Sequence, residues 1–539
     1  MIAANARTWK LQVSDTFVCR DLAASLETGT ERLDTRHDPT RIDIQHEGGL
    51  TAAVHISLGA WVLDLDLAVE SAHAVVITCA ITNTAARDQR LQSVQPLRYI
   101  GDWGATGIFT RSARDHVHTV PFERHYGFDG VHPLERNAPA VSHWFAAVSG
   151  ANSPTVTMAL HGVPQGIVRW QLTPLQSHTA GIRVLQWSCD IDTMSGMRGV
   201  RIPAGATLPL GAVRLALETL PPDEALRTAA RRCAAAAVVT LPGHPPTGWC
   251  SWYFAGTAVT DDLVRATLDA MDAHPALGVV QIDDGWMRPP GTRTFGPPLV
   301  DERKFPRGLA PVARDITGRG RTPGLWLRPF EGWPDAPGTP AWARGTCIDL
   351  SHPDALAWLR GLARYVTHAW GFRYLKLDFL AFDLYQSWGM ELTGTHGARV
   401  QPSDDTRTNA RLVHDGLAAL RDGAGEAVFL AGCNVPLGCG IGLVDGMRIG
   451  DDVDAANDDR TRTMGMGAID ALGWMNGVLW WNDPDCILVH DPIDPAFARA
   501  WARRVIDARG AVMVGSPLDD PDPQRRILLA DILRAIASQ

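Results

Sequence analysis

The chain has 539 residues, of which 45% are hydrophobic and 20% charged, so its bulk is neither disordered nor collagen-like. At roughly 100–200 residues per domain, this length predicts about two to four domains. The net charge of -9 argues against nucleic acid or an anionic membrane as the main partner, because both require basic patches.

The nine cysteines include no CxxC pair and are odd in number, which favours a reducing cytosol over a disulfide framework or a zinc site. The first residues, MIAANARTWKLQVSD, contain no apolar core of a signal peptide, so we expect a cytoplasmic protein. No run approaches the roughly 18 apolar residues of a membrane span. The 19 tryptophans could stack on sugar rings, although for any single one a place in the core is the more common role.

Residues 1–220 are predicted to form an N-terminal β-sandwich domain. In the segment 61–67, WVLDLDL, apolar and polar residues alternate with a period of two, as in a half-buried strand. Further strands are predicted for β-branched or apolar runs between turn residues, at 74–84, 155–160, 183–191 and 213–217. Many short strands with frequent turns are typical of a sandwich.

Residues 221–247 are predicted to be a helical linker. A helix is expected over 221–237, because proline and acidic residues stand at its start, where the helix dipole favours them. The stretch 241–247, LPGHPPT, predicts a stiff connection and a domain boundary before residue 248.

Strand and helix patterns alternate over residues 248–539, which predicts a catalytic (β/α)8 TIM barrel. The eight candidate strands are at 248–254, 278–283, 324–329, 374–379, 428–433, 444–449, 477–481 and 511–514. Helices are expected between most of them, for example at 261–273, 353–369, 406–421, 461–474 and 494–508, with a last one at 523–536.

Carboxylates recur at the ends of four predicted strands, where a barrel of this kind carries its active site. They follow the second, fourth, sixth and seventh strands, as Asp283 and Asp284, Asp378, Asp451 and Asp452, and Asp483 and Asp485. Two facing carboxylates can act as nucleophile and general acid/base in glycoside cleavage. The same cluster could bind a divalent metal, but the strand ends are poor in histidine and no HExxH motif occurs, so we expect no metal and no cofactor.

Seven short motifs follow one another along the predicted barrel. They are GWCSWY (248–253), QIDDGW (281–286), LWLRPF (325–330), KLDFL (376–380), GCNVP (432–436), VDGMRIGDD (444–452) and NDPDC (482–486). Together they resemble glycoside hydrolase family 36 of the α-galactosidase clan. The resemblance covers roughly residues 245–490. It implies a β-supersandwich before a (β/α)8 barrel, and a retaining, exo-acting α-galactosidase that takes oligosaccharides with a terminal α-linked sugar.

The resemblance also implies catalytic roles. Asp378 in KLDFL matches the family's nucleophile, and Lys376 on the same strand face would lower its pKa, unless the two form only a surface ion pair. Asp452 matches the acid/base, whose pKa should be raised by a drier site or a negative neighbour. Asp451, next to it, is the alternative acid/base.

The remaining matches are to residues that bind the sugar. Asp283 and Asp284 resemble a pair that accepts two sugar hydroxyls, although a helix cap could explain one of them. Arg448 would hold the nucleophile or a hydroxyl, or belong to a surface network. The pocket walls would be Trp252 and Trp326, and Cys433 would lie near the sugar's 2-position, unless it is only a small buried apolar residue.

Departures from the family pattern leave the exact substrate open. Arg328 stands where some members have a small residue, and the run 453–459 differs from the aromatic and acidic residues common there. Trp103 in the loop 101–104 could reach over the barrel mouth or lie on the surface. The alternatives are an α-N-acetylgalactosaminidase or other α-glycosidase, a transglycosylase, a catalytically silent carbohydrate-binding protein and a metal-dependent barrel hydrolase.

Overall fold

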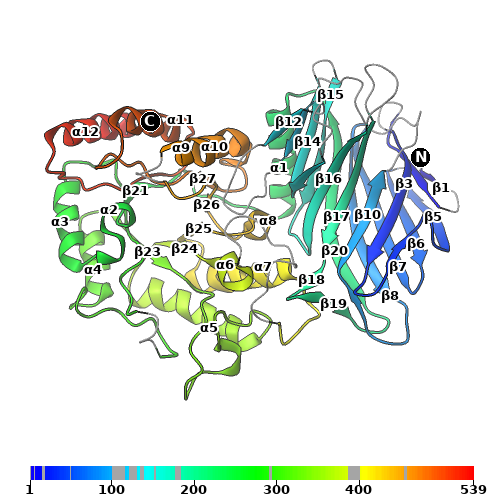
Figure 1. Ribbon diagram of the computed structural model, residues 1–539, viewed down its shortest axis with the longest axis horizontal. Coiled ribbons are helices and arrows are strands. Elements are labelled where there is room, and N and C mark those ends of the chain that lie inside the picture. Colours follow the sequence, from blue (N-terminus) through cyan, green and yellow to red (C-terminus); the bar gives the residue numbers. More distant parts are fainter. Residues whose placement is uncertain are drawn as a thin grey trace.

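The computed structural model describes residues 2–4, 7–14, 18–48, 50–99, 116–119, 130–133, 139–150, 153–175, 184–289, 294–386, 401–453 and 458–538. Trp103 lies outside these residues. Figure 1 shows a two-sheet β-sandwich beside a barrel of parallel strands surrounded by helices. The predicted fold class, a supersandwich followed by a (β/α)8 barrel, is confirmed. The domain boundaries at 220/221 and 247/248 stay predictions.

In the described residues of the sandwich there are two large antiparallel sheets and a small third one. The first sheet contains β1 (Ile2–Ala4), β2 (Trp9–Gln12), β3 (Val18–Glu27), β10 (Ser93–Tyr99), β17 (Val184–Asp192), β16 (Ile167–Leu175) and β13 (Ala140–His143) in this order, with β4 (Arg32–Asp34) paired to β3. The second runs β12 (Val131–Pro133), β11 (His116–Thr119), β14 (Phe145–Gly150), β15 (Ser153–His161), β20 (Thr207–Glu218), β8 (Ala74–Asn83), β7 (Trp61–Ser71), β6 (Thr51–Leu58) and β5 (Thr40–Gly48). The third joins β18 (Met194–Ser195), β19 (Arg198–Ile202) and β9 (Gln89–Leu91).

The period-two pattern decides which face of a strand is buried. Along β7 burial alternates from Trp61 to Leu67, with the apolar positions inside. Its register with β8 sets Leu65 opposite Cys79, and both side chains are buried in the core between the sheets. A shift by one residue would expose this whole apolar set, so the pattern also fixes the register.

Helix α1 (Pro222–Ala236) connects sandwich and barrel where a helix was predicted. Its small apolar face packs against β14 and β15 of the sandwich. On the barrel side Arg227 donates to the carbonyl oxygens of Gly473 and Asn476, at 2.9 and 3.2 Å. The helix therefore contacts both the sandwich and the barrel.

The barrel strands are all parallel to their neighbours. Their order is β27 (Trp481–Asp483), β26 (Gly446–Arg448), β25 (Phe429–Gly432), β24 (Tyr374–Leu377), β23 (Thr322–Leu327), β22 (Val279–Ile282), β21 (Thr247–Cys250) and β28 (Val512–Val514). The ring is nearly closed, since Ala511 N donates to Asn482 O at 2.8 Å beside the two end strands.

The helices that accompany these strands lie on the outside of the ring or in the loops (Figure 1). They are α2 (Trp252–Ala255), α3 (Asp261–Met271), α4 (Leu309–Gly318), α5 (Pro353–Arg364), α6 (Leu380–Tyr385), α7 (Asn409–Ala424), α8 (Leu437–Gly440), α9 (Asp458–Thr461), α10 (Gly467–Leu472), α11 (Pro495–Asp507) and α12 (Pro523–Ala537). Within the described ranges, none of the helices combines the length and the apolar character needed to cross a bilayer.

Most predicted barrel elements differ by a few residues at their ends, and the helix expected over 353–369 becomes π-helical at Tyr365–Ala369. Three further elements differ more. The first barrel strand ends at Cys250, and the chain then turns into α2. The seventh begins at Trp481 and not at Gly477, because Gly477 has a φ of 67° and belongs to a turn. The single helix expected over 461–474 is divided by a π-helical turn, Arg462–Met466, in which Gly465 packs against Trp501.

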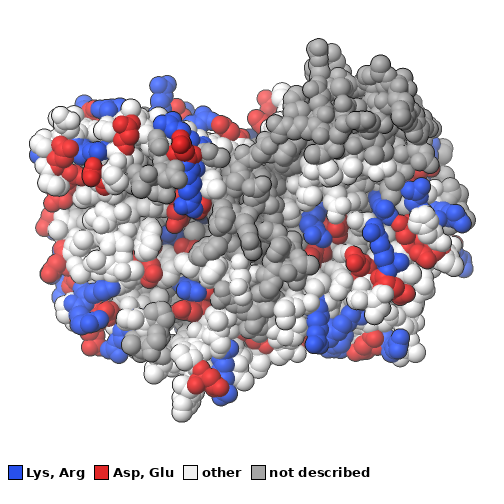
Figure 2. All heavy atoms as spheres, viewed as in Figure 1, with Lys and Arg blue, Asp and Glu red and all other residues white. Residues whose placement is uncertain are grey.

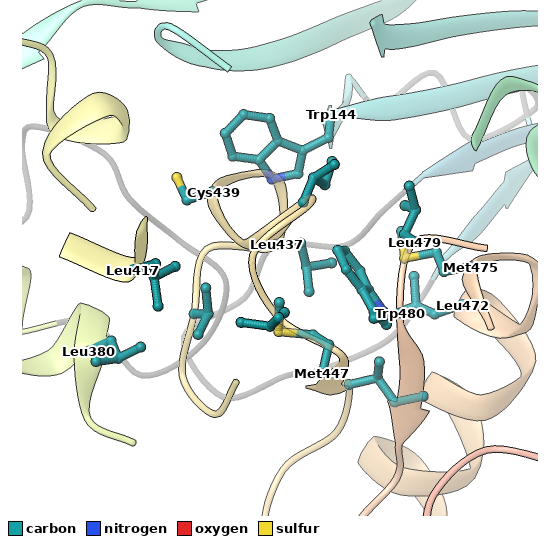
Figure 3. Packing of buried hydrophobic residues seen from close by; sticks show 14 of the residues in the cluster. Trp144, Leu380, Leu417, Leu437, Cys439, Met447, Leu472, Met475, Leu479 and Trp480 are labelled. Atoms are coloured by element: carbon teal, nitrogen blue, oxygen red, sulfur yellow. The ribbon is translucent and has the colours of Figure 1, made fainter. Parts of the chain in front are cut away.

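One tryptophan of the sandwich packs on the barrel. Trp144 lies between β13 and β14 with a φ of 65°, and it is fully buried. In Figure 3 its ring lies over α8, beside Leu437 and Cys439. A Cβ at Gly438 would lie 2.5 Å from the Trp144 ring, so only glycine fits beneath it. Here the close packing of the interface depends on one large and one minimal residue.

This packing predicts strong coupling between the two positions. Trp144→Ala should lower the free energy of unfolding by about 3–5 kcal/mol through the cavity it leaves. Gly438→Ala should cost about 1–3 kcal/mol by overpacking. In the double variant the new methyl group occupies part of the cavity, so the combined loss in urea unfolding should be smaller than the sum.

Gly361→Ala is the matched control, because Gly361 is also helical and no heavy atom lies within 4 Å of the position that a Cβ would take there. It should leave stability unchanged or slightly higher. If the losses of unfolding free energy in Trp144→Ala and Gly438→Ala add up in the double variant, the predicted contact is contradicted.

Candidate active site

The predicted site residues all line one cavity at the carboxyl ends of the barrel strands. The cavity has a volume of about 260 Å³. Its wall contains Trp252, Asp283, Asp284, Trp326, Lys376, Asp378, Phe379, Cys433, Asn434, Arg448, Gly450, Asp451 and Asp452. The structure thus brings together all nine candidates, which come from six different strands or the loops that follow them.

Asp378 is held at the end of β24. Its backbone N–H continues the ladder by donating to Leu327 O at 2.9 Å. Its Oδ2 accepts the indole N–H of Trp326 at 3.0 Å, and its Oδ1 accepts Phe379 N at 2.7 Å. Phe379 has a φ of 60°, and this left-handed residue turns the chain from the strand into α6. The carboxylate therefore has a fixed orientation on a rigid element.

Lys376 lies between two carboxylates. Its Nζ is 3.1 Å from Asp283 Oδ2 and 3.8 Å from Asp378 Oδ2. Burial alone would lower the pKa of the ammonium, but Asp283, and less strongly Asp378, keep that pKa well above its ordinary value. Lys376 is therefore a cation, and the surface ion pair that was the alternative is excluded by its burial. It contacts Asp283 more closely than the predicted nucleophile.

The aspartates of QIDDGW are held differently from one another. Asp283 is buried, and its Oδ2 accepts from Lys376, from the Gln281 amide and from the Cys250 thiol. Its Oδ1 accepts Asp284 N at 2.9 Å. Asp284 Oδ1 accepts Gly285 N at 2.6 Å within a turn, so neither aspartate caps a helix.

Arg448 has carboxylate partners on two sides, one of them unpredicted. Its Nη2 lies 2.7 Å from Asp452 Oδ1 and 2.5 Å from Asp485 Oδ2. The side chain of Arg448 is only 2% exposed, so it does not belong to a surface network. It pairs with the predicted acid/base and not with the nucleophile.

The pKa of Asp452 differs from the sequence-based expectation. Burial would raise the pKa of this carboxyl, but Arg448 and Lys376 lower it, and the net pKa lies below its ordinary value. A cation opposite the acid could not be foreseen from RIGDD. Asp485 shows the opposite direction, because burial raises its pKa more than Arg448 lowers it.

The structure distinguishes Asp452 from Asp451. The Asp452 side chain is 58% exposed, whereas that of Asp451 is 15% exposed. Asp451 Oδ2 pairs with Arg460, and its Oδ1 accepts Asp452 N at 2.8 Å. Asp451 is thus engaged in holding the loop, and Asp452 is the one more accessible to a ligand.

Cys433 and Trp252 complete the wall. Cys433 directly follows β25, and its sulfur accepts from Arg448 Nη1 at 3.9 Å. Burial, followed by the charge of Asp378, raises the pKa of its thiol well above the ordinary value, so it is a neutral, small side chain. Trp252 lies in α2, directly after the first barrel strand.

Sequence reasoning missed several residues of the cavity and its surroundings. Phe379 and Asn434 stand next to predicted residues in KLDFL and GCNVP, which was the only indication of their place. Asn434 Oδ1 accepts Phe382 N at 2.8 Å and so positions α6. Asp485 was recognised as a carboxylate at a strand end, but no local pattern predicts its contacts with Arg448 and Tyr253.

Arg328, the predicted departure, lies beside the cavity. Its guanidinium forms a bidentate pair with the buried Asp383 of α6, with Nε at 2.9 and 3.0 Å from the two carboxylate oxygens. It also lies over the ring of Phe379, 4.4 Å from the centroid. The large residue is thus accommodated by folding against α6. Of the other departure, 453–459, residues 454–457 lie outside the described ones.

A larger open groove, of about 640 Å³, lies along α5 and α7. Its arginines are paired with Asp415 and Asp422, and it contains none of the predicted site residues. Among the described residues, no three or more His, Cys, Asp or Glu side chains form a group that could hold a metal ion. The one His-x-His pair of the sequence, His116 and His118, stands in β11 of the sandwich.

Comparisons with known proteins agree with the architecture. No family model matches the sequence. A curated protein from Escherichia coli, named alpha-galactosidase, is 30% identical over 150 residues, which are 27% of this chain and 19% of that protein. The matched segment thus spans less than a fifth of that relative's length.

Solved structures match over nearly the whole chain. An α-galactosidase from Thermus thermophilus superposes with a TM-score of 0.53 at 21% identity, covering 95% of this chain and 94% of the other. A GH36 α-galactosidase from Geobacillus stearothermophilus gives 0.63 at 12% identity, covering 97% and 75%. This chain has the fold of the GH36 α-galactosidases. The resemblance indicated by the seven motifs is confirmed at the level of this GH36 fold.

The position of Lys376 predicts a pH-dependent loss of stability in Lys376→Met. Removing the ammonium leaves Asp283 buried without its cation, at a cost of about 3–5 kcal/mol at pH 7. Only the ionised carboxylate needs the missing cation, so the deficit in urea unfolding should be smaller at pH 5 than at pH 7.

Lys304→Met is the control, because Lys304 Nζ donates to the backbone oxygens of Thr257 and Gly285. Its deficit should change little between pH 5 and pH 7. The same pH-independent loss in both variants would contradict the role assigned to Lys376.

Proposed function

We propose that the protein is a retaining, exo-acting α-galactosidase. The observation that carries the proposal is the pair of carboxylates in one small cavity, each close to a different buried cation. Asp378 is fixed by Trp326 and lies near Lys376, while Asp452 is more exposed and pairs with Arg448. We infer the substrate class from proteins with this fold. Solved α-galactosidases from Thermus and Geobacillus contain p-nitrophenyl α-galactopyranoside, stachyose or raffinose.

In the first step Asp378 attacks the anomeric carbon while Asp452 protonates the leaving oxygen. The hydrogen bonds from Trp326 and Phe379 orient the attacking carboxylate before the sugar arrives. The C–O bond to the leaving group breaks, and a covalent galactosyl ester on Asp378 forms.

Asp452 must hold a proton to act in this step. In the structure partial desolvation acts to raise its pKa, but Arg448 and Lys376 together outweigh this and the net pKa is lowered. A sugar that covers the exposed carboxylate removes further water and so favours the protonated form. In the second step Asp452 takes a proton from water, which opens the ester and restores the α configuration.

The cavity also supports exo action. Its volume of about 260 Å³ lies below the roughly 300–1,000 Å³ that is typical of sites for drug-sized ligands, so it suits one terminal sugar. Asp283, Asp284 and Lys376 line it and offer acceptors and a donor for hydroxyl groups. No metal or cofactor is part of the proposal.

The partner proposed is thus a small oligosaccharide. On the face shown in Figure 2, basic and acidic side chains of the coloured residues are interspersed over the barrel, which does not favour a polyanion as ligand. All nine cysteines are buried thiols, which supports the further proposal of a reducing, cytoplasmic location.

Asp378→Ala should lower kcat for p-nitrophenyl α-galactoside by several orders of magnitude, because the variant lacks the carboxylate that forms the ester. Azide fits into the space left and attacks from the same face, so activity should return with β-galactosyl azide as the product, identified by NMR. Asp415→Ala, on α7 in the groove outside the cavity, is the control and should keep full activity. An active, azide-independent Asp378→Ala enzyme would refute the nucleophile.

A panel of nitrophenyl α-glycosides assayed with the wild-type protein separates the remaining alternatives. If the α-N-acetylgalactosaminide is hydrolysed faster than the α-galactoside, the protein is an α-N-acetylgalactosaminidase. If product forms only when a sugar acceptor is present, it is a transglycosylase. If none of the glycosides is cleaved, it is a carbohydrate-binding protein without catalytic activity. Loss of activity with a chelator would favour a metal-dependent hydrolase.

Asp452→Ala should show losses that depend on the leaving group. A nitrophenolate leaves with little protonation, whereas raffinose and melibiose need the acid, so kcat/KM for these sugars should fall by about 10²–10⁴-fold and for the nitrophenyl substrate by much less. Asp451→Ala should impair both substrate classes equally, because Asp451 holds the loop. Equal losses in Asp452→Ala would make that residue structural.

A further inference from the structure

Asp485 is a buried aspartate behind the cavity wall. It follows β27 by two residues, has a φ of 85° and exposes only 5% of its side chain. Its Oδ2 accepts three donors, which are Arg448 Nη2 at 2.5 Å, Val453 N at 2.9 Å and the Tyr253 hydroxyl. These donors come from the ends of two other barrel strands or the segments that follow them, so one oxygen atom joins the ends of β21, β26 and β27.

The contact with Arg448 connects Asp485 to the acid/base. The same nitrogen, Nη2, also donates to Asp452 Oδ1 at 2.7 Å. One guanidinium nitrogen thus serves two carboxylates, one buried and one exposed to the cavity. The bond to Val453 N also fixes the backbone directly after Asp452.

A cation that is shared attracts each carboxylate less than a cation with one partner. Asp485 has the same sign of charge as Asp452 and lies against the same nitrogen, so both its charge and its hydrogen bond oppose the effect of Arg448. We propose that Asp485 is a positioning residue that divides Arg448 between two carboxylates and so keeps the proton affinity of Asp452 high enough for acid catalysis. The inference rests on the proposed function in assigning that acid role to Asp452.

The other cations that act on Asp452 form their ion pairs with other carboxylates. Lys376 on β24 contacts Asp283 and Asp378, and Arg460 of α9 pairs with Asp451. The further titratable groups near Asp452 are the Tyr253 hydroxyl and the Cys433 thiol, and burial raises the pKa of both. The negative charge of Asp483 helps to raise the pKa of Asp485, and Asp483 Oδ1 accepts the backbone N–H of Asp485 at 2.9 Å. Asp485 is therefore the carboxylate that offsets Arg448 directly.

Asp485→Asn tests the inference, because the amide keeps a carbonyl acceptor and loses the charge. Arg448 then acts on Asp452 alone, so the basic limb of the kcat/KM profile, which reports loss of the catalytic proton, should move to lower pH by about one pH unit. At pH 7 raffinose hydrolysis should fall about tenfold more than nitrophenyl galactoside hydrolysis. A basic limb at the wild-type pH, with only KM or stability changed, would overturn the proposal.

A matched control is Asp445→Asn. Asp445 is likewise a buried aspartate that accepts from an arginine, Arg421 Nη2 at 2.5 Å, and from a backbone N–H, that of Leu430. It lies outside the cavity wall, so its loss should lower stability and leave the pH profile unchanged. A similar pH shift in Asp445→Asn would show that the effect in Asp485→Asn is a general result of losing a buried charge.

A direct titration separates failure of the inference from failure of the proposed function. In protein labelled with 13C at the aspartate carboxyl carbon, the signal absent from Asp452→Asn belongs to Asp452. Its midpoint should be lower in Asp485→Asn than in the wild-type protein, even if no glycoside is hydrolysed. An unchanged midpoint would refute the inference whatever the activity.

If Asp485→Asn does not fold, as judged by circular dichroism, Tyr253→Phe is the second variant. It removes one donor from Asp485 Oδ2 and strengthens the remaining bond to Arg448, so the Asp452 midpoint should rise. A midpoint that stays or falls in Tyr253→Phe would overturn the proposal.

Discussion

The candidate site depends on two buried cations that are each shared by two aspartates. Lys376 lies between Asp283 and Asp378, and Arg448 between Asp452 and Asp485. Gathering four carboxylates at one barrel mouth would be strongly unfavourable without these cations, because burial disfavours charge and like charges repel. Each cation thus permits a pair of carboxylates that the fold could not otherwise bury together.

The two pairs are not equivalent, and the difference suits two chemical roles. Lys376 is a point charge near a carboxylate that a tryptophan N–H also holds, an arrangement that fixes the orientation of the attacking group. Arg448 is divided between a buried carboxylate and one exposed to the cavity. The exposed one can be covered by a ligand and change its protonation, which a general acid requires. Two aspartates with different surroundings can therefore act as nucleophile and acid.

This placement at the strand ends requires unusual backbone conformations. Phe379, Asn434 and Asp485 are non-glycine residues with φ of 60°, 55° and 85°, and each stands at or beside a residue of the site. Such conformations cost of the order of 1–3 kcal/mol each and persist only where the surroundings impose them. Here the surroundings are α6, which Asn434 binds through Phe382 N, and the hydrogen bonds that converge on Asp485.

Much of the architecture follows from local patterns. Alternation in 61–67 and the order of apolar strands after 248 determine which faces are buried, and they were sufficient to predict the sandwich and the barrel. The carboxyl ends of parallel strands meet at one edge, so Asp283, Asp378 and Asp452 could be placed in one site from their positions in the sequence. The π-helical turn Arg462–Met466, within the helix predicted over 461–474, was not indicated by the apolar periodicity.

What the sequence could not provide were the contacts between residues far apart. The second partner of Arg448 stands 37 positions later in a loop, and the direction of the Asp452 pKa depends on where Arg448 and Lys376 lie in the fold. Arg328 was recognised as unusual, but its pairing with Asp383 needed the course of α6. Spacing predicts which residues share an edge, whereas hydrogen bonds and proton affinities depend on side-chain directions that only tertiary packing fixes.

The sandwich supports the site without lining the described cavity wall. Trp144 packs on Gly438 in α8, and α8 lies only a few residues after Cys433 and Asn434 in the same loop (Figure 3). Asn434 in turn holds the start of α6, next to Phe379 and the Asp378 carboxylate. Packed side chains and backbone hydrogen bonds thus form a continuous path from the N-terminal domain to the predicted nucleophile. A residue of the N-terminal half therefore packs directly on the loop whose earlier residues, Cys433 and Asn434, line the cavity.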